Sequence, residues 1–169
     1  MIAIRRFIWT WCARPLFRWS PHPAYGFRRF LLRLVGMQLG RRVRCRRTVD
    51  IDQPWNVRLD DLVMISDDVL LRAGSPIHIG SRCVISQYCS LLTSVRDPGS
   101  PGHPPVQGPI TISEDCWIAT DSLVLPGTTL EPGVVVGARG LVEGRLPAWH
   151  IATGEPARAR HERVLHSST

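Results

Sequence analysis

The chain has 169 residues, 44% of them hydrophobic, which is enough for a single domain with one core. Its five cysteines are odd in number and form no CxxC pair, so neither a disulfide framework nor a zinc knuckle is favoured, and a reducing cytosol is the default compartment. The net charge is +7, and most of the excess lies in residues 1–47, which contain no acidic residue. The positive charge of residues 1–47 comes from arginines, and no nucleic-acid recognition motif accompanies them. We therefore expect an anionic, phosphorylated or membrane-linked substrate and no nucleic-acid partner.

The amino-terminal segment, residues 1–19, mixes arginines with large aromatic side chains. No apolar run in it is long enough to span a bilayer, and arginines interrupt any signal-peptide core. Two interpretations remain open. The aromatic side chains either cap the domain that follows or pack on a neighbouring subunit, or residues 1–20 make a weak contact with an anionic membrane surface.

Residues 27–35 predict one amphipathic helix that ends at Gly36, a typical glycine stop. The apolar positions on helical spacing are Phe27, Phe30, Leu31, Leu34 and Val35.

An unbroken interval of six residues separates aliphatic side chains in the second half of the chain. The series is Ile112, Ile118, Val124, Leu130, Val136 and Val142. This period fits neither an amphipathic helix nor an alternating strand, but it suits a chain wound into flat-sided coils with one short strand and one corner per hexad. The residues four places after each aliphatic are small, as stacked corners require: Cys116, Ser122, Thr128, Val134 and Gly140. We therefore predict an all-β solenoid stabilised by stacking of its coils.

The same interval can be followed backwards, with one displacement by two residues. The two series are Leu59, Ile65, Leu71 and Ile77, and then Ile79, Ile85 and Leu91. Because Cys83 and Cys89 keep the phase of Ile77, the sequence leaves open whether the displacement is a local adjustment at His78 or a real break. These cysteines and Cys116 stand where a small buried residue is needed, so we expect packing roles for them and not nucleophilic ones.

The hexad pattern disappears between Leu91 and Ile112, in a stretch with five prolines. Proline cannot donate to a strand ladder, so residues 93–109 are predicted to leave the coil as an extruded loop. Loops of this length are usually functional; the alternative is a tolerated surface insertion.

Two blocks go beyond the bare hexad: CWIATDSLVLPGTTLEPGVVVGARGLV at 116–142 and GEPAR at 154–158. Together with ISQYCSLLTS at 85–94, they resemble the hexapeptide-repeat acyltransferases, and within them the colanic acid acetyltransferase group. The resemblance covers residues from about 28 to 163. It implies a left-handed parallel β-helix that assembles as a homotrimer, with acetyl-CoA as co-substrate in the cleft between adjacent solenoids. It also implies that the acceptor is a hydroxyl, commonly on a carbohydrate.

On this basis the chain divides into three parts. Residues 1–40 are an amino-terminal arm and helix, residues 41–147 are the β-helix with its extruded loop, and residues 148–169 are a carboxy-terminal tail. The expected location is the cytoplasm, peripheral at the inner face of the membrane if the arm touches lipid.

The resemblance implies a catalytic histidine in the extruded loop, in a context like T-G-S-H-D, which takes the proton from the acceptor hydroxyl. Here Arg96 stands at that position, followed by Asp97. An arginine stays protonated and cannot act as an ordinary general base, and loss of such a base costs about 10²–10⁴-fold in rate. Either the chain is an inactive or scaffold paralogue, or it transfers slowly by orientation alone, or another residue is the base. His103 is the main candidate for that base, and His78 is a weaker one.

Five further residues match the acceptor and thioester contacts that the resemblance implies. Ser86 and Gln87 are expected to orient the acceptor, and Trp117 is expected either to shape the cleft wall or to pack on an outer face. Gly137 and Ala138 match the contacts at the thioester end of the cofactor.

Three arginines are expected near the phosphates of CoA, namely Arg145, Arg158 and Arg163; the alternative for them is a solvated tail. No metal is expected, because the related solenoid carbonic anhydrases need three histidines and only His78 and His103 lie among the central coils.

Overall fold

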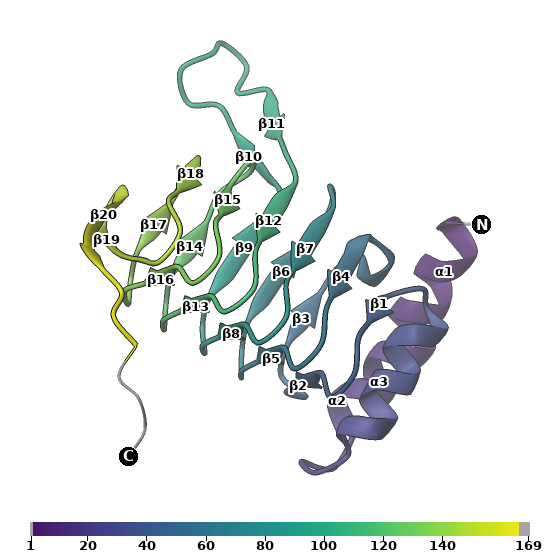
Figure 1. The fold of residues 1–169 in the computed structure, drawn as a ribbon. Helices are drawn as coiled ribbons and strands as arrows, with labels where there is room; N and C mark the ends of the chain where they lie inside the picture. The colour runs from purple at the N-terminus through teal and green to yellow at the C-terminus, as the bar shows by residue number, and fades with distance from the viewer. Residues whose placement is uncertain (1, 166–169) are drawn as a thin grey trace.

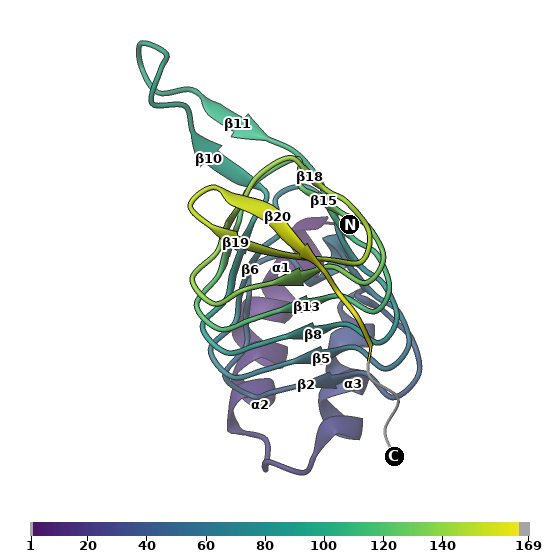
Figure 2. The ribbon, with the colours of Figure 1, turned by 60° about the vertical axis from the view of Figure 1, so that its left-hand side comes forward.

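The computed structural model describes residues 2–165 and shows a parallel β-solenoid with helices at its amino-terminal end (Figure 1). The chain winds repeatedly around three sheets, which form the three sides of a prism (Figure 2). The predicted all-β solenoid is confirmed.

Each of the three sheets is built from one strand per coil. Sheet A contains β1 (Gln38–Leu39), β4 (Val57–Leu59), β7 (Ile77–Ile79), β12 (Ile110–Ile112), β15 (Thr129–Leu130) and β18 (Arg145–Leu146). Sheet B contains β2 (Arg44–Cys45), β5 (Met64–Ile65), β8 (Val84–Ile85), β13 (Trp117–Ile118), β16 (Val135–Val136), β19 (His150–Gly154) and β20 (Ala157–Glu162). Sheet C contains β3 (Asp50–Ile51), β6 (Leu70–Arg72), β9 (Ser90–Leu92), β14 (Leu123–Val124) and β17 (Leu141–Val142).

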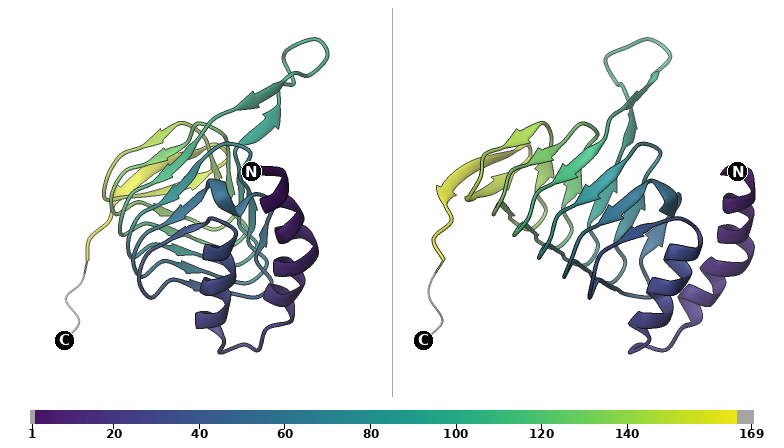
Figure 3. Two further views of the ribbon diagram at one scale, coloured as in Figure 1. Left: turned by 90° about the vertical axis from the view of Figure 1, so that its right-hand side faces the viewer. Right: turned by 45° about the vertical axis from the view of Figure 1, so that its right-hand side comes forward.

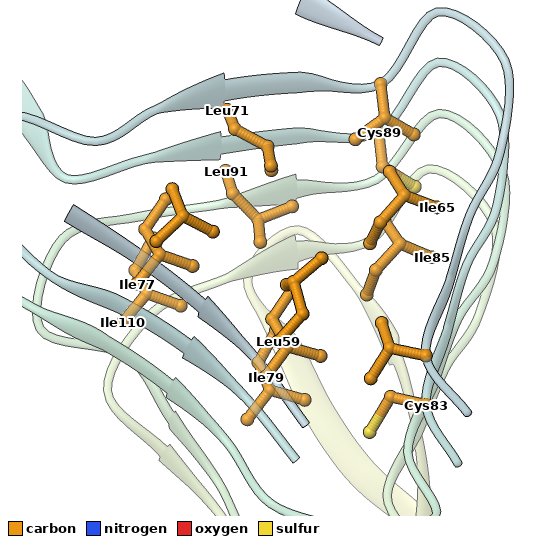
Figure 4. Packing of buried hydrophobic residues seen from close by; sticks show 14 of the residues in the cluster. Leu59, Ile65, Leu71, Ile77, Ile79, Cys83, Ile85, Cys89, Leu91 and Ile110 are labelled. Atoms are coloured by element: carbon orange, nitrogen blue, oxygen red, sulfur yellow. The ribbon is translucent and has the colours of Figure 1, made fainter. Parts of the chain in front are cut away.

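The six-residue series forms the inner column of the prism. Leu130 pairs with Ile112 one coil earlier, Val136 with Ile118, and Val142 with Val124, and all six side chains are fully buried. In the earlier coils the same inward stacking brings Leu59 against Ile79, Ile65 against Ile85 and Leu71 against Leu91 (Figure 4). Because each side chain contacts its equivalents above and below, stability comes from one continuous core.

The displacement at His78 is a real insertion and not a local adjustment. Leu59 pairs with Ile79, and Leu39 pairs with Leu59, so these coils contain twenty residues. The two extra residues lie at the corner between sheets C and A, where Ile77 stacks between Val57 and Ile110 as an additional buried position. Cys83 and Cys89 are buried at the other two corners, as expected of packing residues.

The amino-terminal segment forms α1 (Ile2–Ile8), a π-helical turn η1 (Trp9–Ala13) and α2 (Arg14–Trp19). Trp9 and Phe17 are buried against the first coil, and the indole Nε1 of Trp9 donates a hydrogen bond of 2.9 Å to the carbonyl of Ile51. The interpretation that aromatic side chains of this segment cap the first coil is therefore confirmed for these two residues.

The helix predicted at residues 27–35 is α3 (Tyr25–Leu34), and Gly36 follows it with φ of +99°. Its buried face matches the predicted apolar face only at Leu31 and Val35. Leu31, Leu32 and Arg28 are buried, whereas Phe27, Phe30 and Leu34 are exposed. The reason is that the guanidinium of Arg28 is needed inside, where backbone carbonyls accept its hydrogen bonds.

Residues 93–109 leave the coil, as predicted, and carry an antiparallel hairpin of β10 (Ser94–Arg96) and β11 (Pro105–Gln107). The hairpin projects well beyond the prism (Figures 1 and 2). At its base the amide of Gly108 donates a hydrogen bond of 3.0 Å to the carbonyl of Thr93. Because this bond closes the excursion, β12 rejoins sheet A in register with β7.

Both ends of the solenoid extend past the boundaries drawn from sequence. β1 already pairs with β4, before residue 41, and β19 pairs with β16, after residue 147. β20 then folds back antiparallel on β19. No helix within residues 2–165 has the length and apolar character needed to cross a bilayer.

Candidate active site

Most of the sequence-predicted site residues gather along two of the three edges of the prism. The hairpin edge is the edge where sheet C passes into sheet A, and it comprises residues 93–109, 125–128 and 143–144. The glycine edge is the edge where sheet B passes into sheet C, and it comprises residues 86–89, 119–122 and 137–140. Within one chain, the width of sheet C separates the two edges.

Arg96, Asp97 and His103 come together at the outer end of the hairpin. The guanidinium Nη1 of Arg96 donates a hydrogen bond of 3.1 Å to the carbonyl of His103. The imidazole Nδ1 of His103 lies 3.2 Å from the carbonyl of Asp97. A carbonyl oxygen can only accept, so Nδ1 is the donor in this contact. In a neutral imidazole this contact selects the tautomer with the proton on Nδ1, whose Nε2 can accept a proton.

The carboxylate of Asp97 holds the turn of the same hairpin. It accepts hydrogen bonds from the hydroxyl of Ser100 at 2.5 Å and from the amide of Gly99 at 2.9 Å. These two bonds lower the pKa of Asp97 below its ordinary value. Asp97 thus shapes the turn, and its backbone carbonyl orients His103.

Ser86, Gln87 and Trp117 lie on or beside the glycine edge. Trp117 is 46% exposed, and its indole Nε1 donates a hydrogen bond of 3.0 Å to the hydroxyl of Ser86. This bond leaves the Ser86 hydroxyl proton available to another acceptor. The carbonyl of Gln87 accepts hydrogen bonds from Thr120 and Asp121 in the next coil, so the edge is fixed at this point while the Gln87 side chain is exposed.

Gly137 and Ala138 continue the glycine edge one coil further on. A Cβ atom on Gly137 would lie 2.7 Å from the methyl carbon of Thr153, so a larger residue there would have to displace the exposed Thr153 side chain. Ala138 is exposed. Next to it, Arg139 and Gly140 line an open cavity of about 460 Å³ together with Asp121 and Glu155. This cavity is a plausible size for part of an extended ligand.

Arg145 and Arg158 lie at the carboxy-terminal end of the hairpin edge. Arg145 forms an ion pair of 2.8 Å with Glu131, and Arg158 lies 3.7 Å from Glu143, two residues before Arg145. Arg163 is engaged differently: its Nη1 donates to the carbonyls of Asp115 and Gly133, and its guanidinium lies 5.7 Å from the ring centroid of Trp149. Arg163 therefore fastens the carboxy-terminal segment to the coils.

One cluster was not found from sequence. The imidazole Nε2 of His78 lies 2.9 Å from the carboxylate of Asp60, which also pairs with Arg58 at 3.0 Å. Asp60 and His78 border an open cavity of about 330 Å³ on sheet A with Arg82 and Glu114. Arg58 pairs with His78 in register one coil apart, so the twenty-residue coil length would have revealed this neighbourhood. The cluster lies on a side of the prism away from the glycine edge.

Comparison with known proteins identifies relatives along nearly the whole chain, although no family model matches it. The chain is 42% identical over 162 residues to the Escherichia coli K12 protein described as "Putative colanic acid biosynthesis acetyltransferase WcaF"; the match covers 96% of this chain and 89% of that protein. It is also 31% identical over 109 residues to the E. coli protein described as "Putative lipopolysaccharide biosynthesis O-acetyl transferase WbbJ", covering 61% of this chain and 56% of the relative.

Solved structures share the same fold. A maltose O-acetyltransferase from Clostridium difficile superimposes with a TM-score of 0.85 at 19% identity, over 97% of this chain and 89% of that one. A galactoside acetyltransferase in complex with coenzyme A also gives 0.85 at 19% identity, over 95% and 82% of the two chains. At this level of identity the likeness concerns the fold alone.

Proposed function

Because the chain belongs to the hexapeptide-repeat acetyltransferases, we propose that it transfers the acetyl group of acetyl-CoA to a hydroxyl of a sugar or polysaccharide precursor. The observation that carries this proposal is the pair of half-sites on different edges. One edge offers Trp117, the Ser86 hydroxyl and a glycine-rich turn, and the other offers a projecting histidine. Neither half can complete a reaction alone.

A homotrimer would unite these halves. In a closed ring, every copy uses the same two surfaces, so the hairpin edge of one copy meets the glycine edge of the next. The hairpin projects beyond the prism, as it must to reach a neighbour (Figure 2). A WcaF-like relative and coenzyme-bound structures of the same fold support acetyl-CoA as the co-substrate.

The proposed roles follow from the local geometry. Acetyl-CoA lies along the cleft between copies, with its thioester near Gly137 and Ala138 and its phosphates near Arg145 and Arg158. Ser86, Gln87 and Trp117 position the acceptor. The Nε2 of His103 takes the proton as the acceptor oxygen attacks the thioester carbonyl, and CoA leaves as the thiol once that proton is passed on.

Arg96 is a positioning residue in this scheme. It replaces the histidine of the family pattern, and its bond to the His103 carbonyl holds the turn that presents the new base.

The second candidate function is a non-catalytic trimer that stabilises or regulates an active partner. The observation in its favour is that same replacement, because a protonated guanidinium cannot serve as the base.

The test measures free CoA released from acetyl-CoA with a panel of nucleotide sugars and oligosaccharides. We expect the native chain to release CoA with at least one acceptor, and His103→Ala to lower kcat about 10²–10⁴-fold. His161→Ala, an exposed histidine outside both edges, is the matched control and should retain activity. Release that occurs only in Arg96→His would support the non-catalytic alternative, and activity unchanged in His103→Ala would remove His103 from the mechanism.

A further inference from the structure

The amino-terminal helices expose an unusual amount of apolar surface. Trp19 is 86% exposed, Trp11 71%, Ile4 65% and Phe7 63%. Isolated exposed apolar side chains are common, but tryptophans of this exposure in one short segment need a partner. We call these four residues, with Leu16, the outer helix face.

Helical phase shows that the outer helix face is a second, separate side of the segment. Trp9 and Phe17 are buried against the first coil, and Trp11 and Trp19 each follow them by two residues. Two residues turn an α-helix by about 200°, so the exposed tryptophans point away from the prism. The helix is therefore apolar on both sides, while only one of them is covered within the chain.

α3 adds apolar side chains to the same end of the molecule. Phe27, Phe30 and Leu34 are 44%, 61% and 62% exposed, and their spacing of three and four residues aligns them along one side of the helix. Viewed from the amino-terminal end of the prism, the continuous rod formed by α1, η1 and α2 runs beside α3 (Figure 3, left). This end therefore carries two apolar stripes.

The charge around these stripes is of one sign. Residues 1–49 contain no aspartate or glutamate, and the exposed arginines of this region include Arg6, Arg18, Arg33, Arg41 and Arg42. The first acidic residue, Asp50, is engaged by Arg14 at 2.9 Å. A second copy packed face to face would oppose arginine to arginine, which is unfavourable. An anionic surface would neutralise them.

We propose that the outer helix face docks the protein on the surface of an anionic phospholipid bilayer. Tryptophan and phenylalanine enter the region between headgroups and acyl chains, and the arginines bind lipid phosphates. Apolar side chains facing out and arginines beside them are the composition that interfacial helices require. Since Trp9 of η1 and Phe17 of α2 already hold the opposite side of the segment on the first coil, no folding of these two elements is needed on binding.

The test is co-sedimentation of the full chain with vesicles of phosphatidylcholine alone or with one-third phosphatidylglycerol. We expect binding to the anionic vesicles, little binding to the zwitterionic ones, and a weaker interaction at high salt. Trp11→Ser and Trp19→Ser should each lower the partition coefficient about tenfold, because each removes one deeply inserted aromatic side chain. Circular dichroism confirms that the variants fold.

The matched control is Val164→Ser with Leu165→Ser, two exposed apolar residues at the other end of the chain, which should leave binding unchanged. A chain that stays in the supernatant with anionic vesicles at low salt overturns the proposal. So do tryptophan variants that sediment like the parent. If the tryptophan variants instead reduce the molecular mass in ultracentrifugation while vesicles have no effect, the face is covered by a second copy and the lipid proposal is wrong.

Discussion

Arg28 is a buried residue whose hydrogen bonds link the amino-terminal helices to the first coil. Only 1% of its surface is exposed. Its guanidinium donates hydrogen bonds of 2.8 to 2.9 Å to the carbonyls of Cys45, Pro21 and His22 and to the hydroxyl of Ser20. The planar guanidinium group can donate to all of these separate acceptors at once, whereas the ammonium group of a lysine cannot do so with the same geometry.

We predict that Arg28→Lys lowers the free energy of unfolding by about 2–3 kcal/mol, because buried carbonyls lose their partners. Chemical denaturation monitored by circular dichroism measures the change. Arg47→Lys, at an exposed position nearby, is the control and should change stability by less than about 0.5 kcal/mol. Equal stability of the two variants would show that the network around Arg28 contributes nothing.

At the scale of elements, the hairpin takes no part in the packing of the coils from which it projects. Thr93 and Gly108 close its base, and β12 continues sheet A with the same pairing as its neighbours. The residues between them make no contribution to the buried column, since Val95 and Val106 are at least partly exposed.

We predict that replacing residues 95–106 by a two-residue Asn-Gly turn leaves the melting temperature within a few degrees of the parent but abolishes acetyl transfer. The reason is that the replacement removes His103 and Asp97 while leaving the stacked coils intact. Differential scanning calorimetry and the CoA-release assay make the two measurements. A loss of ten degrees or more, or retained turnover, would contradict this separation of roles.

The elements differ in how far sequence could define them. The six-residue interval reports buried contacts directly, so the solenoid and its excursion were predictable. The buried face of α3 was not predictable, because hydrophobic spacing places Arg28 on the exposed side of the helix. Only the three-dimensional arrangement of carbonyls around Arg28 explains why its side chain is buried.

The site was predictable only in part for the same reason. Arg96 and His103 could be named from the chain, but their mutual bonds and the Asp60–His78 pair depend on folding that brings separate residues together.

At the scale of the whole molecule, the proposal that two copies share one site can be tested by complementation between two variants. A chain lacking the hairpin still has an intact glycine edge, and a chain with Trp117→Ala still has an intact hairpin. In a ring assembled from both, some contacts pair the two intact edges.

We predict that each of these two variants is inactive alone and that co-expressed mixtures regain about a quarter of the parent activity, the fraction expected from random assembly of such contacts. Two different affinity tags allow the mixed rings to be isolated, and their activity should rise to about a third of the parent's, because one contact of three in each mixed ring joins the two intact edges. Light scattering should report a mass about three times the 19.0 kDa of one chain. A mixture with no activity, in an assembly of confirmed composition, would place the whole site within a single chain.

The hydrogen bond between Gly108 and Thr93 has a wider consequence for how such proteins diversify. Because the ladder resumes unchanged beyond it, an excursion of another length or composition could be grafted at this corner without redesign of the scaffold. The side chains presented at the tip of the excursion could then change by exchange of this one segment, while the stacked coils are inherited intact.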